Sequence, residues 1–189
     1  MVDWHGHVKI REAAETVVGG GVIAYPTEAV WGLGCDPSND QAVRKILCLK
    51  QRPVDKGLIL IGSCVDHFSQ YIQGLEPKYL QLFTIPLSQP TTWLVPDNGF
   101  APRWVVGNHA TVALRITCHP VVSALCNTFG GAIVSTSANP QGLPAATTQT
   151  KVEEYFAESL DFYAPGDVVG ASKESEIKNL LTGEVVRSG

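Results

Sequence analysis

The sequence predicts an α/β fold, in which helices and strands alternate along the chain. Short apolar runs lie between glycines, as in residues 58–61 between Gly57 and Gly62, and such runs are typical of buried strands. Between these runs lie segments with apolar residues at helical spacing, of which residues 40–47 are a good example. The 189 residues are 44% hydrophobic, enough for one substantial core, so we predict a single domain over residues 1–189.

The first half of the chain gives four expected elements, each with a boundary signal. In order, they are a helix at 11–18, a strand at 22–25, a helix at 40–47 and a strand at 58–61. Glycines 19–21 end the first helix, and Pro26 ends the first strand because proline has no N–H for a sheet. Asp40 is a residue type favoured at a helix N-terminus, so the second helix is expected to begin there.

The second half of the chain continues the alternation. Its expected elements are helices at 65–72 and 77–87, strands at 92–95 and 112–116, a helix at 120–128, a strand at 132–135, a helix at 150–156 and two strands within 177–187. Pro120 occupies a first helical position, where its fixed φ is favourable, and Thr182-Gly183 forms a turn between the last two strands. Turn-forming residues are frequent between 89 and 108, which indicates a flap rather than part of the core.

Composition narrows the class of protein. A net charge of −4 does not indicate a nucleic-acid-binding protein, although 14 Lys and Arg are enough to line one cleft. The five cysteines are odd in number and include no Cys-x-x-Cys pair, which indicates free thiols and argues against a disulfide framework or structural zinc. The N-terminus lacks a signal-peptide pattern, and the chain has no run of about 18 apolar residues. We therefore expect a soluble, cytoplasmic protein that does not use a membrane.

The segment after the first expected strand carries polar side chains between a proline and two glycines. Ligand crevices in open α/β sheets form at the C-terminal ends of strands, so Thr27 and Glu28 are expected to reach into one. Gly32 and Gly34 would let the backbone approach a ligand closely. The alternative is a plain turn with Trp31 in the core. The segment has no Gly-x-Gly-x-x-Gly pattern, so it is not a dinucleotide fingerprint.

A cluster of cations follows the second expected helix. Lys50 and Arg52 are two residues apart, Pro53 ends the helix, and Lys56 follows four residues after Arg52. Three cations this close repel one another unless an anion or solvent screens them, so the cluster indicates an anion site. The alternative is a cationic helix C-terminus that interacts with the helix dipole.

A hydroxyl-rich segment follows the apolar run at 132–134. Ser135, Ser137 and Asn139 alternate along it, so their side chains are expected on one face before Pro140. An ordinary surface turn is the alternative reading. Combined with the cation cluster, the hydroxyls suggest a site for phosphate or carboxylate, and hence a nucleotide-handling enzyme.

Two further arginines need partners. Arg115 ends an apolar strand, where its guanidinium requires a carboxylate ligand, an internal acid or an exit to solvent, and Arg187 poses the same choice. Among the histidines, only His5 and His7 have a spacing suited to a metal, and without a third ligand we expect both to be solvent-exposed. The sequence contains neither a Gly-x-Ser-x-Gly elbow nor a convincing Cys–His pair, so it does not indicate a protein nucleophile.

In order and spacing, these motifs resemble the YrdC/TsaC family over essentially the whole chain. The segments that carry the resemblance are 25–28, 31–34, 50–53, 111–115 and 135–139, the last followed by Gly142. The resemblance is to the short bacterial form, since no further domain follows Gly189. It implies an open, twisted mixed sheet with helices packed against it and a concave, positively lined cleft.

The resemblance also implies an activity, that of an L-threonylcarbamoyladenylate synthase. Members of the family convert L-threonine, bicarbonate or CO2 and ATP into threonylcarbamoyl-AMP and pyrophosphate. Downstream transferase proteins then place the threonylcarbamoyl group on position 37 of tRNAs that read codons beginning with A. Mg²⁺ is expected to arrive with ATP and not at a dedicated protein site.

The resemblance assigns roles to individual residues. Lys50 and Arg52 are expected to be catalytic through contact with the ATP phosphates. Further ATP contacts are expected from Thr111, Ser135, Ser137, Asn139 and Arg187, and threonine contacts from Thr27, Arg115 and Ser175. The chain departs from the family pattern at Glu176, where many members have Thr-Val, and at Gly57, which is often proline. A histidine contact of some members has no evident counterpart.

Two other functions remain open at this stage. One is a non-catalytic module that binds double-stranded RNA, rRNA or tRNA through the same cleft, against which the lack of an arginine-rich or aromatic-interleaved motif counts. The other is a carbamoyl-phosphate-using transferase domain of the kind found in larger hydrogenase-maturation proteins. The absence of accessory domains in the sequence counts against that function.

Overall fold

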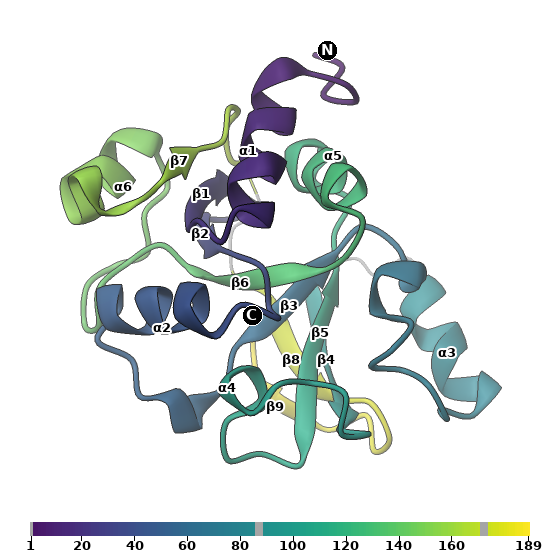
Figure 1. The fold of residues 1–189 in the computed structure, drawn as a ribbon. Coiled ribbons are helices and arrows are strands. Elements are labelled where there is room, and N and C mark those ends of the chain that lie inside the picture. Colours follow the sequence, from purple (N-terminus) through teal and green to yellow (C-terminus); the bar gives the residue numbers. More distant parts are fainter. Residues whose placement is uncertain (1, 86–88, 171–173) are drawn as a thin grey trace.

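A computed structural model describes residues 2–85, 89–170 and 174–189, and in it nine strands form one mixed sheet (Figure 1). In order across the sheet, the strands are β7 (Phe162–Tyr163), β1 (Ile23–Pro26), β2 (Trp31–Gly34), β6 (Ile133–Ser137), β3 (Ile59–Gly62), β5 (Thr111–Ile116), β4 (Thr91–Pro96), β8 (Glu176–Asn179) and β9 (Val185–Arg187). The α-helices are α1 (Val8–Val18), α2 (Asp40–Leu49), α3 (Pro77–Thr84), α4 (Arg103–Val106), α5 (Pro120–Phe129) and α6 (Gln149–Phe156). Three short 3₁₀ helices complete the described elements, namely η1 (Val54–Lys56), η2 (Val65–Phe68) and η3 (Ala157–Ser159). The predicted α/β class with a mixed sheet is confirmed.

Two apolar cores cover opposite faces of the sheet. Successive strand residues point to opposite faces, so Leu60 and Val134 enter one core while Ile61 and Ile133 enter the other. The second core is closed by α1 and α5, which lie side by side (Figure 1). The first core is larger and includes the apolar sides of α2, α4 and α6.

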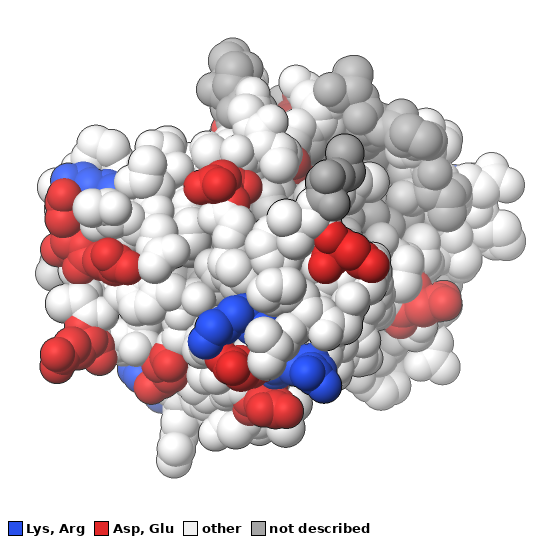
Figure 2. Space-filling view, turned by 90° about the horizontal axis from the view of Figure 1, so that it is seen from above, with Lys and Arg blue, Asp and Glu red and all other residues white. Residues whose placement is uncertain are grey.

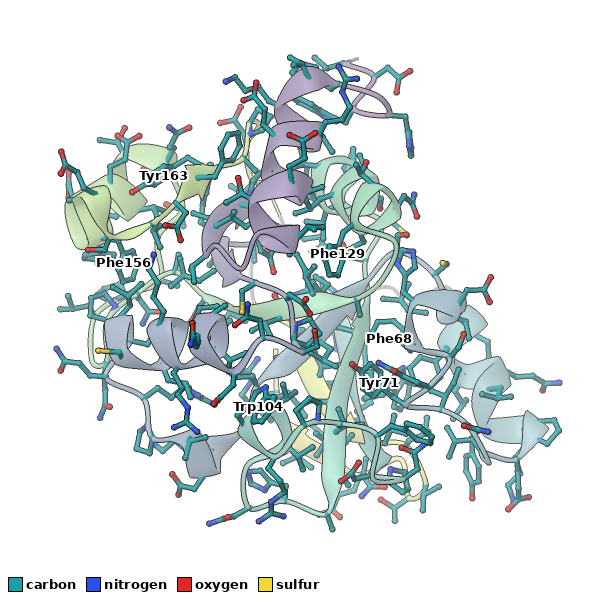
Figure 3. The ribbon with its side chains drawn as sticks, viewed as in Figure 1. Phe68, Tyr71, Trp104, Phe129, Phe156 and Tyr163 are labelled. Atoms are coloured by element: carbon teal, nitrogen blue, oxygen red, sulfur yellow. The ribbon has the colours of Figure 1, made fainter. Side chains whose placement is uncertain are left out.

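Aromatic side chains mark both cores (Figure 3). Phe68 and Tyr71 are buried between the sheet and α3, and Phe156 closes the same core from α6. Phe129, at the end of α5, packs against the smaller core. The smaller core covers only part of its face, because it includes Ile133 and Ile61 but stops short of the rest of β6 and β5. The uncovered part of that face forms the floor of the candidate site.

Helix boundaries follow local hydrogen bonding. Asn39, one residue before the expected start, caps α2 by accepting a hydrogen bond from the Ala42 N–H at 3.1 Å. His7 accepts one from the Lys9 N–H at 3.2 Å and caps α1. His7 is half-buried, so the prediction that it is solvent-exposed is wrong, whereas His5 is exposed as predicted. None of the helices in the described residues has the length and apolar character needed to span a membrane.

Several expected elements differ from those observed. The segment 65–72 forms only η2 and turns, and the expected helix 77–87 ends at Thr84, with residues 86–88 outside the described part. The section 89–108 is not a flap, because β4 and α4 place Trp93, Val95, Val105 and Val106 in the larger core. The final two strands form as predicted, with β8 antiparallel to β9.

Candidate active site

A cavity of about 350 Å³ lies over the part of the sheet that the smaller core leaves uncovered. Its floor comes from alternate residues of neighbouring strands, such as Ala113 on β5, Ile59 on β3 and Ser135 on β6, because these share one face. Its apolar wall residues are Ala29, Val30, Trp31, Leu58, Leu94, Val105, Val106, Ile177 and Val186. Its charged and polar wall residues are Thr27, Arg52, Lys56, His109, Thr111, Arg115, Thr136, Ser137, Glu174, Ser175 and Arg187.

Two arginines form a cationic end of this cavity. Arg52 is held by η1, where its guanidinium donates to the Gly57 carbonyl at 3.0 Å and to the Lys56 carbonyl at 3.3 Å. Burial and the nearby charge of Arg187 both lower the pKa of Arg52. Arg187 donates to the Ser175 carbonyl at 2.8 Å and forms an exposed ion pair with Glu174 at 3.4 Å. The two guanidinium groups repel each other, and a bound anion would offset this repulsion.

Lys50 is not among the wall residues, unlike Arg52. Gln51 adopts φ of 51°, a left-handed conformation, so the two cations leave the chain in different directions. Lys50 is 6% exposed, and the cavity wall does not include it. Its ammonium donates to the Ser137 carbonyl, to the Asn139 carbonyl at 2.8 Å and to Asn139 Oδ1 at 3.2 Å. Desolvation by burial lowers the pKa of Lys50 to about 8, and the charge of Arg52 acts in the same direction.

The loop that Lys50 holds begins at the end of β6. Ser137 remains within the strand and on the cavity wall, and its hydroxyl donates to Asn139 Oδ1 at 2.7 Å. Asn139 donates to the Leu143 carbonyl at 2.7 Å and is not a wall residue. Ser135 and Ser137 therefore reach the cavity as expected, together with the intervening Thr136, whereas Asn139 braces the loop.

Arg115 has an internal partner as well as a place on the wall. It is 9% exposed, and its guanidinium forms an ion pair with Glu28 on the turn between β1 and β2. The other oxygen of Glu28 accepts a hydrogen bond from the Thr117 hydroxyl at 2.6 Å. Of the two partners that the sequence left open, the structure contains the internal acid. Arg115 Nε is buried and has no partner among the described residues.

Of the two glycines after β1, Gly34 is required for close packing within the protein, and only Gly32 is on the cavity wall. A side chain at Gly34 would place its Cβ 2.6 Å from the Tyr25 ring and from the Val134 carbonyl, so the expectation that Gly34 admits a ligand is wrong. Gly32 does lie on the wall. Trp31 is buried, as the alternative reading held, and also forms part of the wall. Thr27 is buried on the wall, and its hydroxyl donates to the Val30 carbonyl at 2.7 Å.

Two predicted residues of the opposite wall lie on or beside β8 and β5. Ser175 is buried and its hydroxyl hydrogen-bonds the Thr92 hydroxyl at 2.9 Å. Thr111 opens β5 and is half-buried. His109 also reaches the wall, although the sequence offered no spacing that singled out this histidine. Glu174 was missed for the same reason, since only the fold of the C-terminal tail brings it there.

The structure thus collects most of the residues to which the sequence assigned a binding role. On the wall are Thr27, Arg52, Thr111, Arg115, Ser135, Ser137, Ser175 and Arg187. Asn139 belongs to the adjoining loop, and Lys50 donates hydrogen bonds to it. Within the described residues, no group of three or more His, Cys, Asp or Glu is arranged to hold a metal ion. The wall is suited to a ligand that carries both phosphates and a carboxylate.

Comparison with known sequences identifies relatives along nearly the whole chain. A family model for Sua5, YciO and YrdC proteins, described as telomere recombination, matches residues 15–189. A threonylcarbamoyl-AMP synthase of Saccharophagus degradans is 50% identical over 188 residues, which cover 100% of this chain and 98% of the relative. One from Cellvibrio japonicus is 48% identical, and the alignment covers 99% of each chain.

Solved structures show the same fold. The P. abyssi Sua5 structure in complex with L-threonine has a TM-score of 0.83 and 28% identity over 90% of this chain, which spans 50% of the Sua5 chain. E. coli YciO has a TM-score of 0.77 over 95% of this chain and 88% of its own, and at 23% identity it supports the fold alone.

Proposed function

We propose that this chain, which belongs to the Sua5/YciO/YrdC family, forms threonylcarbamoyl-AMP and pyrophosphate from L-threonine, bicarbonate or CO2 and ATP. The observation that carries the proposal is a single cavity that has Arg52 and Arg187 at one part of its wall and Arg115 at another, with hydroxyls between them. Relatives of nearly the same length, at about half identity, carry the name of this activity.

The chemistry needs positioning more than a protein nucleophile. The amine of threonine and CO2 give a carbamate, and a carbamate oxygen then attacks the α-phosphate of ATP, so that the bond to pyrophosphate breaks. Both reactants are anions, and the developing charge on phosphorus must be stabilised by fixed donors. A cavity lined by guanidinium groups and hydroxyls provides such donors without a Ser–His or Cys–His pair.

We assign the phosphate end to Arg52 and Arg187, whose mutual repulsion a polyanion would relieve. Ser135, Ser137 and Thr111 provide neutral donors to the nucleotide. Lys50 and Asn139 contribute to ATP binding by holding the loop that carries Ser137, with the Lys50 charge behind that loop. Thr27, Arg115 and Ser175 form the threonine end.

Mg²⁺ enters this proposal as part of the ATP substrate. Among the described wall residues there is one carboxylate, Glu174, which is too few oxygen ligands for a dedicated magnesium site. When bound to the triphosphate, the ion supplies charge neutralisation.

The product would pass to downstream transferase proteins that modify adenosine 37 of tRNA. We place the protein in the cytoplasm, where these tRNAs are. Five free thiols, of which Cys48, Cys64 and Cys118 are exposed, fit a reducing compartment.

The alternative function, RNA binding by a non-catalytic module, receives less support. Figure 2 shows one face of the molecule, on which basic side chains form small groups beside acidic ones. Among the described residues of that face there is no continuous basic surface of the kind that phosphate backbones require. Direct contact with tRNA or double-stranded RNA would have to involve another face.

Pyrophosphate release with threonine, bicarbonate and ATP, omitting each in turn, tests the proposal. We expect release only when all three are present, and serine should support a lower rate because a methyl contact is worth ~1–3 kcal/mol. Arg115→Ala should lose activity, whereas the matched control Arg44→Ala, which removes an exposed ion pair with Asp40, should not. Equal ATP breakdown without an amino acid would refute the proposal.

A further inference from the structure

We propose that Glu28 is a positioning residue that fixes the orientation of Arg115 and thereby sets the affinity for the amino-acid substrate. This inference rests on the proposed function, since it concerns the carboxylate end of the same cavity. Glu28 itself is not among the wall residues, whereas Arg115 is. Glu28 therefore acts on the cavity through Arg115.

Both oxygens of the Glu28 carboxylate are engaged. One oxygen pairs with the Arg115 guanidinium and the other accepts the Thr117 hydroxyl at 2.6 Å. The side chains of Arg115 and Glu28 are 11% and 17% exposed, so water competes little for either group. Arginine has several rotatable bonds, and an arginine without this partner would lose its fixed position.

The Thr117 hydroxyl has a defined direction. It accepts a hydrogen bond from the His119 backbone N–H at 3.0 Å, so its own hydrogen is directed at Glu28. The backbone of Thr117 is itself anchored, because its N–H donates to the Gly62 carbonyl at 2.9 Å at the end of β3. The turn that carries Glu28 is closed by the Thr27 N–H, which donates to the Val30 carbonyl at 3.0 Å. Glu28 is thus held from two sides.

The ion pair leaves Arg115 able to bind a second carboxylate. A guanidinium has five N–H donors, and the ion pair with Glu28 forms through one terminal nitrogen. The other terminal nitrogen, Nη1, forms no hydrogen bond to a described residue. Glu28 and an incoming α-carboxylate can therefore share the group. If Glu28 were instead a competitor for Arg115, its removal would tighten substrate binding, so the sign of the effect separates the two roles.

The test compares Glu28→Ala and Thr117→Val with matched controls. Glu28→Ala should raise KM for threonine by about 10- to 100-fold, the scale of a misplaced binding group, with KM for ATP unchanged. Thr117→Val should raise it by about 3- to 10-fold through loss of one hydrogen bond, while Thr117→Ser should behave as the wild type. Glu12→Ala removes a glutamate from an exposed ion pair on α1 and should have no effect.

Two readouts separate positioning from damage. Threonine binding by calorimetry should weaken in parallel with KM, while kcat at saturating threonine stays within about 3-fold of the wild type. The Arg115 Nε–H nuclear magnetic resonance signal, identified by its loss in Arg115→Lys, should broaden in Glu28→Ala. If Glu28→Ala fails to fold, the KM for threonine of Thr117→Val is compared with that of Thr117→Ser, and a higher value in Thr117→Val alone supports the inference.

An unchanged or lower KM for threonine in Glu28→Ala, or an equal rise in KM for ATP, would overturn the inference. In that case a wild type that still needs threonine for pyrophosphate release leaves the proposed function standing. A wild type that binds no threonine overturns both.

Discussion

A rise in pH above 8 is expected to deprotonate Lys50, with opposite effects on stability and activity. Burial lowers the pKa of this ammonium to about 8, from 10.5 in an unperturbed lysine. The unfolded chain therefore binds this proton more tightly than the folded protein between these two pH values. Because stability rises with pH wherever the unfolded state binds more protons, the folded protein gains stability through this window.

The size of the gain follows from the two pKa values. At ~1.4 kcal/mol per unit, the difference between 10.5 and about 8 corresponds to about 3 kcal/mol of unfolding free energy. The penalty for burying the charge is fully present below pH 8, and it is relieved by pH 10.5.

Activity should fall over the same window. The protonated amine donates to three oxygens, of which one belongs to Ser137 and two to Asn139. A neutral amine has two N–H groups and no charge, so the loop that carries Ser137 loses its strongest anchor. We expect kcat/KM to fall by about 10-fold, the scale of one lost charge-assisted hydrogen bond.

Urea unfolding and pyrophosphate release from pH 7 to 10.5 would measure both effects. From pH 8 to 10.5 the unfolding free energy of the wild type should rise relative to that of Lys50→Met, because the methionine cannot titrate. Lys50→Arg serves as the control that stays charged, and its activity should not show the fall above pH 8. Parallel stability curves for the wild type and Lys50→Met would refute the reasoning.

Three other substitutions test the site. Arg52→Ala should lower kcat/KM by at least ~10²-fold in the pyrophosphate assay, with little change in the urea midpoint, and full activity would contradict its assignment. Ser137→Ala should weaken nucleotide binding by ~1–2 kcal/mol in calorimetry while RNA affinity stays constant, and the reverse pattern would favour the RNA-binding alternative. Gln51→Gly should raise the free energy of unfolding by up to about 1 kcal/mol, because it relieves a left-handed conformation, and a decrease would contradict this account.

The sequence predicted best where the signal is local. The apolar run at 58–61 became β3, and Pro120 does stand at the start of α5. The hydroxyls at 135 and 137 reach the cavity, on the face that strand alternation assigns to both. These features depend on neighbours along the chain, which the sequence displays directly.

The missed features depend on contacts between distant residues. β2 reads Trp-Gly-Leu-Gly, and glycine is depleted in strands, so the sequence predicted no strand in this segment. It forms a strand through pairing with β1 and β6, and residue 34 must be glycine because the ring of Tyr25 occupies the space where a side chain would lie. Similarly, the direction of Lys50 depends on one positive φ at Gln51, and residue spacing carries no information about that angle.

The distribution of charge explains how a protein of net charge −4 can attract anions. Four cations, Arg52, Lys56, Arg115 and Arg187, line the cavity, against Glu174 as the one acidic wall residue described. Fields from charges within a low-dielectric concavity add locally, so net charge says little about the potential there. The Glu28 ion pair partly neutralises one of these cations. The positive charges of Arg52 and Arg187 are less fully compensated, since the ion pair of Arg187 with Glu174 is exposed to solvent and Asp55 only partly offsets the lowering of the Arg52 pKa. A polyphosphate should therefore seat at the Arg52 and Arg187 end, and an amino-acid carboxylate, with its single charge, at the half-neutralised Arg115.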